Sequence, residues 1–290
     1  MRIARQFTSR SLLGSAVLAF IGLTTLAVAA ELNLRPGFNL FTVDQDVLVG
    51  KENAAQVDKQ LLILNDALAT QYVNELGKQL SRFTPNNQPQ YAWQFKVVNS
   101  PDINAFALPG GFIYVNRATL ESAMELAPLA GVIAHEEGHI ILRHGTHQAS
   151  ETMLVQAPLA ILGGFFGQSG SLMSKLAQYG IGFGVQSIML RNSRSMEAQA
   201  DSVGTYVLYQ SGYDPHAMAQ FFQIIEQKYP QQTIQFLSDH PNPGNRIKAV
   251  DEEIPELGPP KTWTTDSPRF QAVKKHLLSL PAAPKPKPQQ

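Results

Sequence analysis

The stretch AHEEGHIILRHG, at positions 134–145, places two histidines four residues apart with an acid directly after the first. On a helix, His135 and His139 would share one face, because residues i and i+4 lie one turn apart. Two imidazole nitrogens at that spacing suit a zinc ion, and Glu136 could reach the attacking water without binding the metal itself. The alternative is a helix whose histidines are only structural. A third ligand elsewhere in the chain would favour the metal site.

The stretch SMEAQAD, at positions 195–201, offers that ligand. Glu197 and Asp201 are again four residues apart, so a helix would present both carboxylates on one face. A glutamate on a second helix can complete a site of two histidines and one glutamate. An aspartate one turn further on can accept the free ring N–H of a histidine ligand and fix its tautomer. Such a pair alone would be an ordinary solvated face, but paired with HExxH it predicts a ligand and its supporting group.

His144 is a weaker candidate for the metal. One known class of zinc site has a third histidine six residues after the second, with a glycine midway. Gly145 and Leu142 occupy those positions here, so that class is excluded. His144 lies five residues after His139, and in a continuing helix it would point away from the same metal. We interpret it as a histidine that is structural or that satisfies a neighbouring polar group.

The stretch SDHPNPGNRI, at positions 238–247, could supply a further polar group. His240 or Arg246 could donate a hydrogen bond to the oxyanion that forms during attack on a carbonyl. His240 could instead occupy the open fourth position on the metal and hold the site latent. A proline-rich turn with surface polar groups is the structural alternative.

The stretch NAFALPGGFIYVN, at positions 104–116, predicts two short strands around Pro109–Gly111. We expect the part at positions 108–115 to supply an edge strand, to which an extended polypeptide could add through main-chain hydrogen bonds. A plain core hairpin is the alternative. The expected substrate-binding residues are Asn104, Gly110, Gly111 and Phe112.

Helices are needed to position the metal motifs. Pro128 suits the first turn of a helix that runs through the histidines to about His144 and stops at Gly145. A second helix is expected at positions 195–212, ending at Gly212.

The remaining elements are predicted from hydrophobic periodicity. Positions 31–50 look extended, positions 51–83 helical, and the alternation of apolar residues at positions 91–98 indicates a strand. The sequence therefore predicts an α+β fold, mostly helical, with a small antiparallel sheet and an HExxH active-site helix.

Composition excludes several kinds of site and partner. The 290 residues include no cysteine, so disulfides, thiolate zinc sites and cysteine nucleophiles are excluded. The formal net charge is zero, and we expect no nucleic-acid partner.

The two ends of the chain look unlike the centre. Residues 1–30 are typical of a signal peptide, with three arginines, an apolar run and a small-residue cleavage site AVAA. An uncleaved anchor is the alternative. We expect secretion across the inner membrane to the periplasm. Residues 256–290 are expected to form a C-terminal helix and a disordered tail rich in proline and lysine.

An apolar, glycine-rich segment at positions 153–190 separates the two metal motifs. It is too interrupted by proline and glycine to cross a bilayer. We interpret it as a lid over the site that also offers apolar surface to a membrane, as a possible peripheral contact, or to an unfolded polypeptide. A core hairpin is the alternative.

Four blocks together resemble the gluzincin metallopeptidase family of HtpX and the CAAX prenyl proteases, most closely its secreted BepA-like branch. They are NAFALPGGFIYVN, GVIAHEEGHIILRH, SRSMEAQADSVG and SDHPNPGNRI, within roughly residues 50–250. The sequence departs from the family at Asn192, where an aromatic residue is usual, and at Pro128, where an acid is frequent. The helical repeat domain of BepA-like proteins is not expected in this chain.

The resemblance implies a zincin-type core, which we assign to residues 31–255 as a zinc metallopeptidase domain. It implies one Zn²⁺ per chain on His135, His139 and Glu197, with Glu136 as the base and Asp201 behind a histidine ligand. It also implies an endopeptidase that acts on unfolded or envelope proteins in periplasmic quality control. The alternative is a chaperone-like assembly factor for envelope proteins with a regulatory metal site.

Overall fold

The computed structural model describes residues 32, 34–85, 89–156, 192–228, 235–241 and 245–285. Its elements in chain order are α1 (Val43–Gln60), α2 (Ala67–Leu80), the 3₁₀ turn η1 (Ser81–Phe83), β1 (Gln94–Val98), β2 (Ala105–Leu108), β3 (Phe112–Asn116), α3 (Arg117–Ser122), α4 (Leu126–Ile141), α5 (His144–Gln156), α9 (Arg194–Ser211), α10 (Ala217–Lys228), α11 (Gln235–Asp239), α12 (Arg246–Leu257) and α13 (Pro268–Ser279). The predicted α+β class with a mostly helical core is confirmed.

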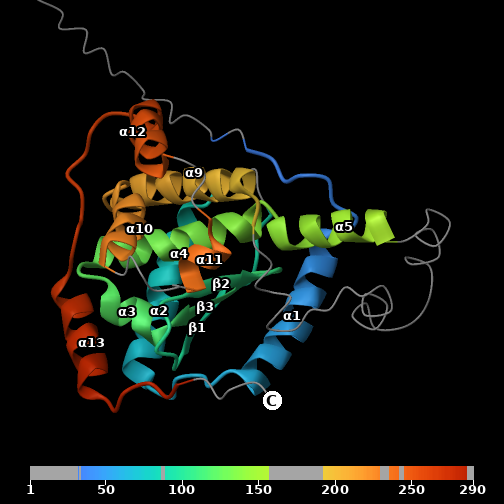
Figure 1. Cartoon of the computed structure of the whole chain (residues 1–290). Helices are drawn as coiled ribbons and strands as arrows, with labels where there is room; N and C mark the ends of the chain where they lie inside the picture. The colour runs from blue at the N-terminus through green and yellow to red at the C-terminus, as the bar shows by residue number, and fades with distance from the viewer. Residues whose placement is uncertain are drawn as a thin grey trace, which may run out of the picture.

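Helix α4 lies at the centre of the molecule. All of its residues are buried, α9 runs along one side of it, and the sheet lies against another (Figure 1). Two glycines allow α4 and α9 to approach closely. A Cβ at Gly138 would lie 3.0 Å from the main-chain oxygen of Ala200, and one at Gly204 would lie 3.3 Å from the main-chain nitrogen of His135. This close crossing brings the carboxylates of α9 to the histidines of α4.

The sheet has three strands in the order β1-β3-β2, and it is mixed. β2 and β3 form the expected antiparallel hairpin, but β1 pairs with β3 in the parallel direction. The prediction of a purely antiparallel sheet is therefore wrong for β1. The local turn fixes only the β2–β3 pairing, whereas the partner of β1 is chosen by long-range packing.

The N-terminal helices differ from the prediction. Positions 43–50 belong to α1 and are not extended, because Thr42 and Gln45 form a reciprocal capping box that starts this helix. The expected single helix at positions 51–83 is two helices. The chain is extended between them, where Leu64 N–H donates to the main-chain oxygen of Val97 (2.8 Å), and Asp66 then caps α2.

The active-site helix ends earlier than predicted. α4 stops at Ile141, and a second helix, α5, begins at His144, so Gly145 lies inside a helix and does not end one. The break occurs at Arg143, which has a left-handed conformation with φ of 58°. The prediction was wrong because Arg143 is held in this conformation by residues of distant α1, as described below.

The C-terminal helix is anchored to the core. Phe270, Val273 and Leu277 of α13 are buried, and Arg117 of α3 donates to the main-chain oxygens of Leu277 (2.6 Å) and Pro281 (2.7 Å). α13 lies within the region where a C-terminal helix was expected, and residues 281–285 follow it without regular secondary structure.

Several expectations fall on residues that the structure does not describe. The predicted signal peptide at 1–30, most of the apolar segment at 153–190 and the last residues of the tail lie outside the described ranges. In the part of the chain that is described, no helix has the length and apolar character needed to cross a membrane.

Candidate metal centre

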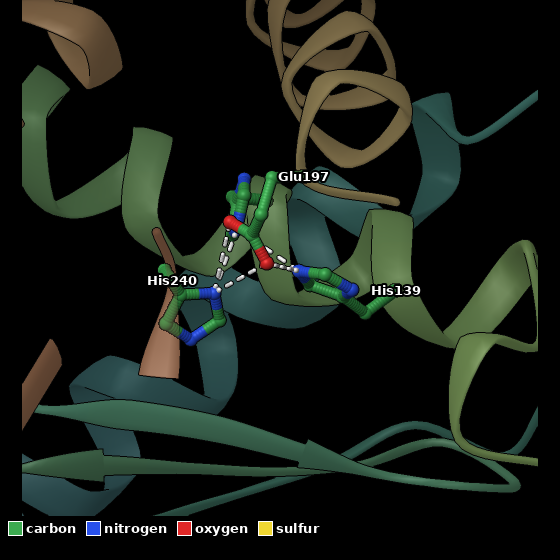
Figure 2. A group of neighbouring side chains, drawn as sticks. His139, Glu197 and His240 are labelled. Atoms are coloured by element: carbon green, nitrogen blue, oxygen red, sulfur yellow. Dashed lines mark hydrogen bonds and ion pairs between the residues drawn. The ribbon is translucent and has the colours of Figure 1, made fainter. Parts of the chain in front are cut away.

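Four buried side chains converge on one point between α4, α9 and the end of α11. His135 and His139 of α4, Glu197 of α9 and His240 each offer one ligand atom, and these atoms all lie within 4.8 Å of one another. Figure 2 shows the Glu197 carboxylate between the rings of His139 and His240. The structure thus brings the three predicted ligands together and adds His240 to them.

The spacing of these atoms fits a small tetrahedral ion. His135 Nε2 lies 3.0 Å from His139 Nε2 and 3.1 Å from His240 Nδ1. The oxygens of Glu197 lie 3.2–3.3 Å from the ring nitrogens of the three histidines. Ligands of a tetrahedral zinc ion at about 2.0–2.1 Å from the metal lie about 3.4 Å from each other. A buried set of three nitrogens and one carboxylate at this spacing therefore fits such a metal.

Glu136 lies at the edge of this group. Its Oε1 is 3.3 Å from Nε2 of His240, the ring whose Nδ1 faces the other ligand atoms. Burial raises the pKa of Glu136, although the neighbouring imidazoles act in the opposite direction. A carboxyl group with a raised pKa is suited to taking up and returning a proton near neutral pH. The ring of His240 lies between this carboxylate and the metal ligands.

Asp201 and Arg246 contact the candidate ligands on the side away from the metal position. Asp201 Oδ1 lies 3.0 Å from Nδ1 of His135, on the side of the ring opposite the metal site. Arg246 Nε lies 2.7 Å from Asp201 Oδ2, and its terminal nitrogen lies 3.4 Å from Glu197 Oε2. The guanidinium also stacks on the ring of Phe222, 3.6 Å from its centroid. The expectation that Arg246 binds an oxyanion stays a prediction.

The charges of the site alter the pKa values of its members. Burial would lower the pKa of His135, but Asp201 and Glu197 outweigh it and raise that pKa to about 9. Burial would raise the pKa of Glu197, but the adjacent His240 and His139 hold it well below its usual range. Burial lowers the pKa of His139 well below its usual value. Glu197 is therefore favoured in its ionised form, and the pKa values of His135 and His139 shift in opposite directions.

The expected substrate-binding residues make contacts within the fold. The Asn104 amide donates to Asp239 Oδ2 (3.0 Å), beside His240. Gly110 and Gly111 form the β2–β3 turn with φ of 78° and 102°, and Gly110 packs against Val47 of α1. Phe112 is buried in a cluster with α1 residues. That these four residues contact substrate stays a prediction.

The free edge of the sheet is not where it was expected. β3 (Phe112–Asn116) is the central strand, so the edge-strand prediction for positions 108–115 is wrong there. Among the described residues, no strand pairs with the outer side of β2. Asn116 N–H donates to Asn104 oxygen (2.9 Å), and the antiparallel register then points the N–H and C=O of Ala107 outward. β2 also packs against α4.

Two polar residues beside His139 were not assigned to the site from the sequence: His144 was discounted as a ligand, and Gln199 was not considered. His144 Nδ1 lies 2.9 Å from His139 Nδ1, and His144 Nε2 lies 3.1 Å from Gln199 Oε1. Burial lowers the pKa of His144 to about 4. The sequence signal was the histidine five residues after HExxH together with a glutamine between the two acids of α9. It was discounted because a continuous helix would have directed His144 elsewhere.

The chain is similar in sequence to several known proteases. The chain is 29% identical over 249 residues to the beta-barrel assembly-enhancing protease of Escherichia coli (strain K12), covering 82% of this chain and 49% of that protein. It is 29% identical over 189 residues to the mitochondrial metalloendopeptidase OMA1 of Schizosaccharomyces pombe, covering 64% and 53%, respectively. The human mitochondrial metalloendopeptidase OMA1 is 31% identical over 183 residues, covering 58% and 33%. The chain thus spans about half the length of the first of these relatives.

A family model covers the elements that build the site. Peptidase family M48 matches residues 67–254, which include the sheet, α4, α9 and His240. The four buried ligand residues and Glu136 all lie within this match. The chain therefore belongs to peptidase family M48.

Proposed function

We propose that this protein is a zinc-dependent endopeptidase that hydrolyses peptide bonds of unfolded polypeptides. The observation that carries the proposal is the buried group of His135, His139 and Glu197 with the Glu136 carboxylate beside it. Membership of peptidase family M48 supports hydrolysis of a peptide bond. The names of the relatives, a protease and metalloendopeptidases, support it further.

Zinc is the metal that best suits these residues. Imidazole nitrogens and a carboxylate at tetrahedral spacing are typical zinc ligands. When bound, zinc supplies Lewis-acid activation of water and of the scissile carbonyl. Glu136 takes the proton of the attacking water and returns it to the leaving amine. Asp201 holds His135 in the tautomer that directs Nε2 at the metal, since its carboxylate lies 3.0 Å from Nδ1.

His240 holds the site latent in this arrangement. Its Nδ1 would take the fourth ligand position on a bound metal, and its Nε2 lies 3.3 Å from the Glu136 carboxylate. One imidazole thus occupies both the open coordination position and the place where the base needs a water. Hydrolysis then requires His240 to leave, which the hydrogen bond between Asn104 and neighbouring Asp239 opposes.

The outer edge of β2 is the proposed polypeptide site. An extended segment can add there through the outward N–H and C=O of Ala107, which is only partly buried. β2 packs on α4, so the added strand would run past the metal ligands. The name of the E. coli relative, which concerns β-barrel assembly, supports envelope proteins as substrates. Together with the expected signal peptide, it supports a periplasmic location.

A second function is favoured by one observation. Metal sites with four protein ligands are typically structural, whereas catalytic zinc sites keep one position open. The presence of His240 among the ligands therefore also suits a chaperone-like assembly factor whose metal is regulatory. A pure binding protein, however, has no use for Glu136.

The Glu136→Gln variant separates the two functions. The substitution keeps all ligands and removes the base, so zinc content stays at the wild-type level while cleavage of casein, a loosely folded polypeptide, falls about 100-fold or more. Both forms are also compared in a His240→Ala background, where the latency contact is absent. Cleavage by Glu136→Gln at the wild-type rate in that background contradicts the proposed mechanism. Zinc binding without cleavage by any form favours the assembly factor.

A further inference from the structure

A hydrogen-bonded chain of three side chains extends outward from His139. Its ring Nδ1 lies 2.9 Å from Nδ1 of His144, and the other nitrogen of His144 lies 3.1 Å from the amide oxygen of Gln199. His144 is buried, at 3% exposure, and its ring is nearly perpendicular to that of His139, with an interplanar angle of 71°. These hydrogen bonds connect His139 of α4 to His144, the first residue of α5, and to Gln199 of α9.

Only one arrangement of protons in this chain is compatible with a metal ligand. Nε2 of His139 is the atom that faces His135 and Glu197, so it must be unprotonated to bind a metal. Nδ1 of a neutral His139 then carries the proton and donates, which makes Nδ1 of His144 the acceptor. The proton of neutral His144 must therefore be on Nε2, where the oxygen of Gln199 accepts it.

We propose that His144 is a positioning residue for the metal site, which accepts the Nδ1–H of His139 and, with Gln199, fixes the tautomer of that ligand. The inference rests on the proposed zinc site and adds a role that concerns only one of its ligands. The two histidine ligands are thereby supported by different chemistry. His135 faces the carboxylate of Asp201 at 3.0 Å, whereas His139 faces a neutral imidazole. The support of His139 adds no negative charge to the site.

The break between α4 and α5 is what places His144. In a continuous helix a residue five positions after His139 would be turned well away from it, because successive residues are about 100° apart. The left-handed φ of 58° at Arg143 interrupts the helix between α4 and α5, and His144 Nδ1 then lies 2.9 Å from His139 Nδ1. Arg143 is held there by Asp46 of α1, whose two carboxylate oxygens lie 2.6 Å and 3.1 Å from its guanidinium nitrogens.

The test compares two substitutions at position 144 with a control on the same helix. His144→Leu fills similar space without an acceptor, whereas His144→Asn keeps an amide oxygen roughly where the imidazole Nδ1 stood. His147→Leu is the control, since His147 bonds to the main-chain oxygen of Phe38 and does not contact His139. Zinc affinity is measured by competition with a chelator, and thermal unfolding of the zinc-free proteins is measured in parallel.

We expect His144→Leu to weaken zinc binding about 10–100-fold, as loss of a partner behind a ligand does, while His144→Asn and His147→Leu bind within about threefold of wild type. Unfolding of the zinc-free variants should not follow this order. Wild-type zinc affinity in His144→Leu, or equal losses in the Leu and Asn variants, would overturn the proposal. If wild type itself binds no zinc, the proposed function fails and not this inference alone.

A spectroscopic measurement tests the tautomers directly. In zinc-loaded wild type, ¹⁵N NMR of the histidine rings should show the protons of His139 on Nδ1 and of His144 on Nε2. A proton on Nδ1 of His144 contradicts the proposal whatever the affinities are. If His144→Leu does not fold, this spectrum of the wild-type protein still tests the proposal.

Discussion

Arg246 Nε lies 2.7 Å from Oδ2 of Asp201, in the interior behind the metal ligands. The other oxygen of Asp201 lies 3.0 Å from His135, so arginine, aspartate and histidine form a line that ends at the site. Arg246 is 3% exposed, and its guanidinium faces both Asp201 and Glu197. Its contacts compensate the charge of two buried carboxylates.

Substitution of Arg246 by alanine should therefore affect the metal site before it affects catalysis. Removing one partner of a buried ion pair typically costs about 3–5 kcal/mol, because the remaining charge is left uncompensated. We expect the zinc-free Arg246→Ala protein to be destabilised by about that amount in denaturant unfolding and to bind zinc more weakly. Arg246→Lys is the matched control and should recover part of the loss. A variant with normal stability and zinc content but a low kcat would instead support the oxyanion role.

Alanine substitutions at Glu197 and Asp201 should weaken zinc binding to different extents. Glu197→Ala removes a ligand and should abolish stoichiometric zinc binding. Asp201→Ala removes the partner of His135 and should weaken binding about 10–100-fold. Glu252→Ala, on the exposed side of α12, is the control. Metal analysis of the purified proteins gives the answer, and full zinc occupancy in Glu197→Ala would place the third ligand elsewhere.

His240→Ala should raise proteolysis. The substitution empties the fourth ligand position and frees Glu136, because one ring contacts both groups. We expect a higher kcat on casein with zinc still bound, since three protein ligands suffice for catalytic zinc sites. Loss of activity with zinc retained would instead assign His240 to oxyanion binding.

Ala107→Pro should weaken the binding of extended substrates. Proline removes the N–H that points out of the sheet and leaves the β2–β3 hydrogen bonds in place. The loss of one main-chain hydrogen bond of about 1 kcal/mol corresponds to a roughly fivefold increase in KM for an unfolded polypeptide. Ala107→Ser keeps the N–H and serves as the control. Unchanged KM in the proline variant would mean that substrate does not add to β2.

Zinc uptake should release protons at neutral pH. The pKa of His135 is raised to about 9, so without metal its ring is protonated below that pH, and zinc must displace the proton. Apparent zinc affinity should therefore fall as the pH is lowered from about 9. Calorimetric titrations in buffers of different ionisation enthalpy measure the protons released. Asp201→Asn removes the largest contribution that raises the pKa of His135 and should reduce the proton release. Zinc binding by wild type without proton release would contradict the assignment.

The shared helix face within each motif could be derived from the sequence because it depends on local periodicity. Residues four apart on a helix share a face in any tertiary context. The spacing therefore predicts that His135 and His139 lie on one face of α4, and Glu197 and Asp201 on one face of α9. The end of α9 at Gly212 could also be predicted from the local sequence, because a glycine readily adopts the φ of 82° that ends the helix. The start of α1 was local too, but the capping box of Thr42 and Gln45 was overlooked.

Other features depended on contacts between distant segments, and only the tertiary structure decided them. β1 pairs with β3 because packing on α2 and α4 brings them together, not because a turn joins them. The sequence placed His240 near the site in two alternative roles. The contacts of α11 with Ile103 and Asn104, just before β2, put its ring among the other three candidate ligands.

His144 illustrates the same division at a single residue. The sequence places a histidine five positions after His139. In a continuous helix, this side chain would be directed away from His139. Asp46, 97 residues before Arg143, stabilises the left-handed turn that reverses this direction. A non-glycine residue adopts that conformation at a cost of about 1–2 kcal/mol. The local sequence does not offset this cost, whereas a partly buried, bidentate ion pair with a residue of another helix can.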